Sequence, residues 1–117
     1  MIEGLHHFDI IVSSEASVQF YERLGFSEFY RKQRDYDTVV LMNGYGIEIE
    51  LFIDPTHPER DTNPERLGLR NISFKVDNIE KTFAELGVQI DKIGMDWIGR
   101  KYAFIVDPDG NPVQLHE

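Results

Sequence analysis

One histidine and three carboxylates recur at alternating positions in two apolar segments of the N-terminal half. They are His7 with Asp9, and Glu48 with Glu50. Alternate side chains of a β-strand point to the same face of a sheet, so each pair would share a face if its segment is a strand. An imidazole beside several carboxylates can attract a cationic group or a divalent metal ion. These four residues are therefore the first candidates for chemistry.

A second polar set lies 64 positions further along the chain. Asn71 corresponds in this way to His7, and Gln114 corresponds to Glu50. Strand parity places aromatic residues on the same face, and we expect Val40 and Met42 there as well. An apolar wall with a few converging polar groups is typical of a small-molecule pocket, whereas the alternative is an antiparallel sheet with one wet face. The predicted ligand-binding residues are His7, Asp9, Glu48, Glu50, Asn71, Ser73, Tyr102, Phe104, Gln114 and His116.

The surrounding pattern of apolar residues and turn residues predicts the order βαβββ twice. The 64-residue spacing also separates Val12 from Val76 and Leu51 from Leu115, which indicates an internal duplication. Segment 54–67 holds three of the five prolines and is predicted to be a linker. The expected strands are 5–12, 26–33, 37–42 and 47–53, then 71–76, 88–94, 101–106 and 112–116. The expected helices are 15–24, capped by Ser13 or Ser14, and the segment from Asp77 or Asn78 to Gly87.

Composition excludes several classes of protein. The chain has 117 residues, the size of one domain, and a formal net charge of −9. This charge argues against nucleic acid and anionic membranes as partners, because both are bound through Lys and Arg. The absence of cysteine excludes disulfides and thiolate metal sites. The N-terminal residues lack the pattern of a signal peptide, so we expect a cytoplasmic protein.

The chain resembles the vicinal oxygen chelate superfamily, which includes glyoxalase I, extradiol dioxygenases, and fosfomycin- and bleomycin-resistance proteins. The segments that carry the resemblance are the strand of His7, the run FYxxLGF (20–26), the strand of Glu50, FKVD (74–77) and DPDGNPVQL (107–115). The resemblance implies an α+β fold in which two βαβββ modules form an open, curved mixed sheet. It also implies one domain over 1–117, with modules at about 1–53 and 68–117, a small-molecule ligand in the concavity, and a homodimer.

Metal-dependent members of this superfamily commonly use His, Glu, His and Glu on four paired strands. By position these are His7, Glu50, Asn71 and Gln114, so Asn71 replaces the usual second histidine. Gln occurs as a ligand in some members, which leaves His7 and Glu50, with Gln114, as a possible metal set. Two neutral amides compensate poorly for the desolvation of a divalent ion. The resemblance therefore predicts either no metal or an incomplete divalent site.

Two classes of function remain open. The first is a metal-free binding protein for a cationic or polar-aromatic molecule. The alternative is a metal-dependent lyase, isomerase or dioxygenase in which Glu50 is catalytic. Glutathione is excluded as a substrate, because Ile11 stands where glutathione-dependent members have an arginine and Asp54 where they tend to have asparagine. Trp97, in the predicted loop 95–100, is expected to anchor that loop, and the alternative is a lid over the cleft.

Overall fold

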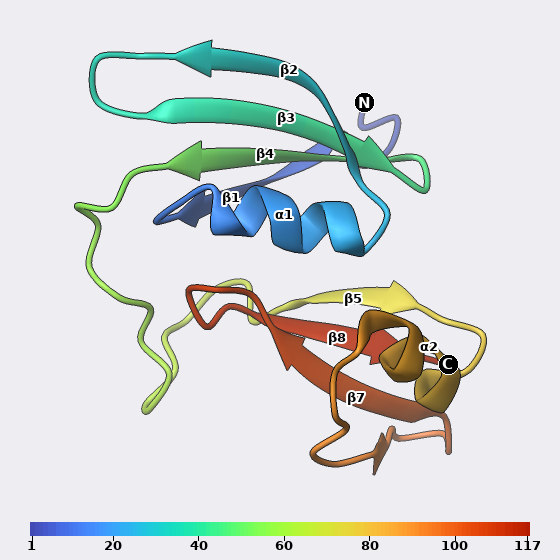
Figure 1. Cartoon of the computed structure of the whole chain (residues 1–117). Helices are drawn as coiled ribbons and strands as arrows, with labels where there is room; N and C mark the ends of the chain where they lie inside the picture. The colour runs from blue at the N-terminus through green and yellow to red at the C-terminus, as the bar shows by residue number, and fades with distance from the viewer. The chain divides into compact units, whose positions relative to one another are not determined.

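The computed structural model describes residues 1–117. The chain divides into two compact units, 1–59 and 60–117. In the first unit the strands lie in the order β1-β4-β3-β2, and α1 runs along one face of this sheet (Figure 1). Strand β1 is parallel to β4, and the other pairs are antiparallel. The elements are β1 (His7–Val12), α1 (Ala16–Arg23), β2 (Ser27–Gln33), β3 (Thr38–Gly44) and β4 (Ile47–Ile53).

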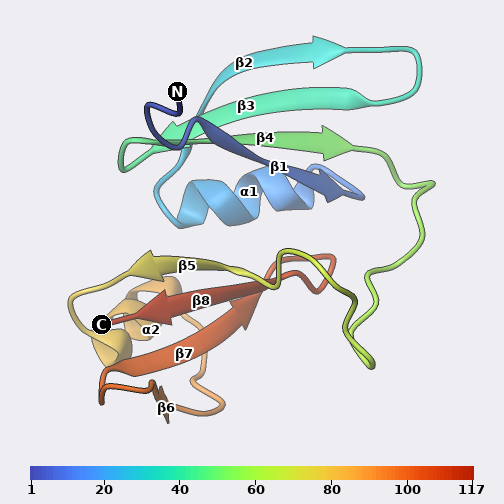
Figure 2. The same ribbon diagram turned by 180° about the vertical axis from the view of Figure 1, so that it is seen from behind.

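The second unit repeats this topology, with strand order β5-β8-β7-β6 and a parallel β5–β8 pair (Figure 2). The predicted α+β class and the two βαβββ modules are therefore confirmed. Both helices have eight residues, and no helix is long and apolar enough to span a bilayer. The elements are β5 (Ile72–Lys75), α2 (Ile79–Leu86), β6 (Gly94–Met95), β7 (Lys101–Val106) and β8 (Pro112–His116).

The expected strand 88–94 is wrong over most of its length. Only Gly94 and Met95 pair with β7. Val88 and Ile93 are 41% and 36% exposed, so this segment buries too little apolar surface to extend the sheet. The pairing begins at a glycine for a steric reason: a Cβ on Gly94 would lie 2.4 Å from the ring of Tyr102.

Each helix begins in a different way. The side chain of Asn78 accepts a hydrogen bond from the Lys81 amide at 2.8 Å, and Gly87 ends α2 in the left-handed region at φ 68°, as predicted. The N-cap position of α1 is Glu15, whose side chain makes no capping bond. Ser14 Oγ instead accepts from the amide of Ala16 at 3.3 Å, and the Ser14 carbonyl accepts from Ser17, so a serine does cap the first turn, one residue before the N-cap position.

The core of the first unit corrects the expected face of β3. Val40 and Met42 are completely buried and pair with Leu51 and Ile49, which are buried too. The cause is the two-residue turn at 45–46, where both residues have positive φ. This turn pairs Gly44 with Ile47 and thereby fixes which residues of β3 oppose the core residues of β4. Val40 and Met42 therefore lie on the opposite face from the predicted ligand-binding residues.

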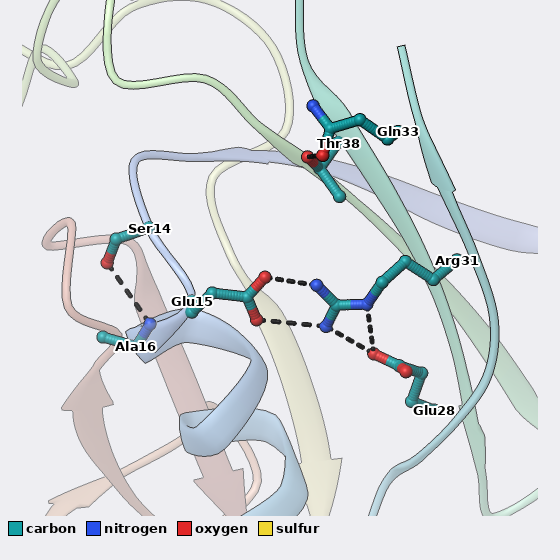
Figure 3. A network of polar contacts seen from close by, with 7 residues as sticks. All are labelled: Ser14, Glu15, Ala16, Glu28, Arg31, Gln33 and Thr38. Atoms are coloured by element: carbon teal, nitrogen blue, oxygen red, sulfur yellow. Dashed lines mark hydrogen bonds and ion pairs between the residues drawn. The ribbon is translucent and has the colours of Figure 1, made fainter.

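An ion-pair network joins the exposed edge strand β2 to the start of α1 (Figure 3). The guanidinium of Arg31 contacts both carboxylate oxygens of Glu15, and its Nε and Nη2 lie 3.1 and 2.6 Å from Glu28 Oε1. These hydrogen bonds raise the pKa of Arg31 and lower that of Glu15. Arg31 therefore holds β2 against the helix at a point where β2 has no buried residue of its own.

Candidate functional site

The parallel pairing of β1 with β4 builds the predicted polar cluster of the first unit. His7 lies opposite Glu48, and Asp9 lies opposite Glu50. Because alternate residues share a face, these pairs form a two-by-two block on the face opposite Ile49 and Leu51. We call this block the acidic cluster: His7, Asp9, Glu48 and Glu50.

The imidazole of His7 is the centre of the acidic cluster. Its Nε2 lies 3.2 Å from an oxygen of Asp9 and 3.2 Å from an oxygen of Glu50. Its Nδ1 lies 4.0 Å from Glu48 Oε2 and 2.8 Å from Nδ1 of His6. The side chains of His7 and Glu50 are 31% and 20% exposed, so a ligand can reach a partly desolvated group.

The acidic cluster carries more negative charge than its own histidine can balance. Burial raises the pKa of Glu50 above its usual value, and the nearby carboxylates Asp9 and Glu48 raise it further, whereas His7 lowers it. Glu50 is thus less favourably ionised than a carboxylate in water. A cation bound here would relieve this unfavourable charge.

The equivalent positions of the second unit hold neutral groups that satisfy one another. Asn71 Nδ2 donates to Ser73 Oγ at 3.1 Å, and the Ser73 hydroxyl donates to Gln114 Oε1. Ser73 and Gln114 are register partners in the parallel β5–β8 pair. Three of the predicted ligand-binding residues therefore form one hydrogen-bonded chain without a charge.

His116 is directed to a residue that the sequence analysis did not select. Its Nε2 lies 3.1 Å from Asp96 Oδ2, and its Nδ1 lies 2.8 Å from the Glu117 carbonyl oxygen. The Tyr102 ring stacks on the imidazole with centroids 6.1 Å apart. Of the predicted aromatic pair, Phe104 is the more accessible at 42% exposed.

Asp96 organises the loop that precedes β7. Its carboxylate accepts hydrogen bonds from the amides of Ile98 and Arg100 and from Arg100 Nε. These bonds lower its pKa to about 2, the Arg100 amide being the largest cause. Trp97 is fully exposed, so the expectation that it anchors the loop is wrong. The sequence signal that could have identified Asp96 is an aspartate three residues before Gly99, because an aspartate side chain often accepts a hydrogen bond from the backbone amide two residues later in a turn.

The donor groups of the two units differ in their fitness for a metal ion. In the first unit, single ligand atoms of His7, Asp9 and Glu50 all lie within 4.8 Å of one another. One imidazole and two carboxylates suit a divalent cation. In the second unit, Asn71 and Gln114 provide only amides, already engaged through Ser73. The first unit therefore fits a metal by itself, through Asp9, which the family pattern does not include.

The two βαβββ units, each with polar residues on the face away from its buried core, define a small α+β protein built from a repeated module. The family model of the Glyoxalase/Bleomycin resistance protein/Dioxygenase superfamily matches residues 4–115. The chain belongs to this superfamily.

Three known proteins illustrate the range of relatives. YwkD of Bacillus subtilis (strain 168), an uncharacterized protein, is 39% identical over 100% of this chain and 98% of its own length. The crystal structure of a glyoxalase family protein from Enterococcus faecalis has a TM-score of 0.88 and 34% identity, covering 99% of this chain and 98% of that one. The fosfomycin resistance protein FosX from Listeria monocytogenes, complexed with Mn(II) and sulfate, has a TM-score of 0.74 and 19% identity. It covers 99% of this chain and 93% of its own, and its likeness shows the fold alone.

Proposed function

We propose that this protein binds a small molecule through a positively charged group, which the acidic cluster recognises. The observation that carries the proposal is the position of His7 between the carboxylates of Asp9 and Glu50, with Glu48 beside them. Three carboxylates around one imidazole form an electrostatic trap for a cation. The ligand is expected to be cationic or polar-aromatic.

The second unit, taken by itself, has features of a separate site for a polar-aromatic molecule. Its corresponding sheet face presents the half-exposed ring of Phe104, with Tyr102 beside it at a centroid distance of 5.9 Å. The neutral groups of Ser73 and Gln114 belong to the same face, because Phe104 is the register partner of Gln114. Aromatic rings with a few hydrogen-bonding groups are typical of organic ligand sites.

The test uses calorimetry with tyramine, an aromatic amine, and with 4-ethylphenol, which has the same ring but no charge. We expect tyramine to bind more tightly, and Glu50→Gln to weaken tyramine about tenfold, since a charge-assisted contact is lost. Glu85→Gln, which changes an exposed carboxylate of α2, is the matched control. Equal binding of the two probes, or an unaltered affinity in Glu50→Gln, would contradict the proposal.

A second candidate is a metal-dependent lyase, isomerase or dioxygenase that does not use glutathione. The convergence of His7, Asp9 and Glu50 favours it, and FosX shows that a protein of this fold can hold Mn(II). A bound ion would supply a Lewis acid for substrate oxygens. His7 and Glu50 would hold it, Glu50 being the catalytic residue, and Asp9 would add the charge that Asn71 and Gln114 lack.

Elemental analysis of protein purified without added metal separates these two candidates. The binding-protein proposal expects well under one equivalent of transition metal per chain. A stoichiometric ion that is lost in Glu50→Gln would favour the enzyme.

We also propose that the protein acts as a homodimer. Ile11 and Phe104, on the polar sheet faces of the first and second unit, are 54% and 42% exposed, and covering exposed apolar surface is favourable. Light scattering at micromolar concentration should give twice the mass of one 13.6 kDa chain. A single-chain mass would refute the dimer.

A further inference from the structure

The two ring nitrogens of His7 face two different sets of possible metal ligands. Nε2 faces Asp9 and Glu50, as described above. On the other side, ligand atoms of His6, His7 and Glu48 also lie within 4.8 Å of one another. This second set contains two imidazoles and one carboxylate, and Glu50 is not part of it.

The local backbone explains how neighbouring histidines converge. Successive residues within a strand point to opposite faces, which would separate His6 from His7. His6, however, precedes β1, which begins at His7. The two rings therefore meet edge to face, with centroids 5.0 Å apart and Nδ1 atoms 2.8 Å apart. Glu48 joins them because it is the register partner of His7.

We propose that His6, His7 and Glu48 form a binding group for a borderline divalent transition-metal ion such as Zn²⁺. Two imidazole nitrogens and a carboxylate oxygen are a donor set that Zn²⁺ accepts, and hard cations such as Mg²⁺ prefer oxygen alone. With Nδ1 of His7 on the ion, the proton of that ring resides on Nε2, where Asp9 and Glu50 each lie at 3.2 Å. Metal-bound histidines usually donate their other N–H to such a carboxylate, which orients the ring.

This site and the metal set of the second candidate function use the same imidazole through opposite nitrogens. In the site of His6, His7 and Glu48, the carboxylate of Asp9 orients the His7 ring. In the metal set of the candidate enzyme, Asp9 is itself a ligand. His6 belongs only to the first. The inference does not require the proposed organic ligand, although it uses His7 and Glu48 of the acidic cluster, and variants of His6 distinguish the two metal arrangements.

The experiment titrates untagged protein with ZnCl₂ in the calorimeter and repeats this for variants. We expect His6→Gln and Glu48→Gln each to weaken Zn²⁺ at least tenfold. His57→Gln, which alters an exposed histidine paired with Asp54, should leave the affinity unchanged. Unaltered Zn²⁺ affinity in His6→Gln, or no binding by the parent protein below millimolar Zn²⁺, would overturn the proposal.

A second readout does not depend on affinity. The ¹⁵N resonances of the imidazoles distinguish a metal-bound Nδ1 from a metal-bound Nε2. Zn²⁺ is expected to shift Nδ1 of both His6 and His7. A shift of His7 Nε2 with His6 unaffected would place the ion on the Asp9 side and overturn the proposal.

Discussion

The two units use the same backbone frame for different chemistry. Asp9 and Glu50 are register partners in the parallel pair of the first unit, and Ser73 and Gln114, each 64 positions later, are partners in the second. The strand order is the same in both units. What differs is the charge, because two carboxylates in one unit correspond to a hydroxyl and an amide in the other.

This difference changes what each face requires from its surroundings. In the second unit the polar side chains satisfy one another through the chain from Asn71 to Ser73 to Gln114. In the first, burial raises the pKa of Glu50, and the carboxylates of Asp9 and Glu48 raise it further, whereas His7 lowers it. A duplicated fold can therefore contain one face whose polar side chains satisfy one another and another on which three carboxylates surround one imidazole.

The largest expected effect concerns two equivalent leucines, one in the core of each unit. Leu51 and Leu115, 64 positions apart, are almost fully buried. Leu51→Ala and Leu115→Ala should each lower the free energy of unfolding by about 2–5 kcal/mol. If the chain is one domain, as the resemblance predicts, both variants will shift a single denaturant transition. Two transitions, each sensitive to only one of the variants, would contradict the single domain.

The next effect concerns the charge of the first unit. Glu50→Gln should raise Tm by a few degrees at pH 7 while weakening a cationic ligand. The sign follows from linkage: the folded pKa lies above the usual 4.5, so the folded state holds a proton that the unfolded state has released. Stability therefore falls as pH rises from about 4.5 through the raised pKa. Scanning calorimetry should show the gain disappearing below pH 4, and a lower Tm at pH 7 would refute this account.

The second unit should respond to pH in the opposite direction, through Asp96. Its folded pKa is about 2, against an ordinary 3.8, so its stabilising contribution is present above 3.8 and is lost as pH falls toward 2. Asp96→Asn should lower Tm by several degrees at neutral pH and by much less at pH 2. It should also lower the fluorescence anisotropy of Trp97, the only tryptophan, because the loop loses its contacts with Arg100 and His116.

Asp91→Asn is the control for Asp96→Asn. Asp91 is exposed and lies in the same connection between α2 and β7. Equal effects of the two substitutions on Trp97 would show that the carboxylate of Asp96 does not hold the loop.

Sequence reasoning predicted the features that depend on local pattern. The alternation in β1 and β4 was sufficient to place His7, Asp9, Glu48 and Glu50 on one face, and the duplication predicted the equivalent residues of the second unit. The predicted sheet face of Val40 and Met42 was wrong. Which residues of β3 face the core depends on the conformation of the turn at 45–46, and the sequence of the strand alone does not determine it.

The periodicity of the sequence did not predict contacts between side chains of distant segments. Asp96 and His116 are 20 positions apart, and no periodicity links a loop aspartate to a strand histidine. The contact of His6 with His7 was missed for a related reason. Alternation predicts opposite faces for neighbours, and the two rings meet only because β1 begins at His7.

The smallest expected effect concerns the edge strands, which the two units secure differently. In the first unit, Arg31 joins the exposed strand β2 to Glu15 at the start of α1. In the second, the short strand β6 is followed directly by the loop that Asp96 organises. Arg31→Met should lower the free energy of unfolding by about 0.5–1 kcal/mol, because ion pairs this exposed contribute little. About 1 M NaCl should remove most of the difference, since salt screens exposed charges. Lys32→Met, one residue further along the strand, is the control for lost charge, and an Arg31→Met deficit that persists undiminished in high salt would show that Arg31 acts by packing rather than by pairing.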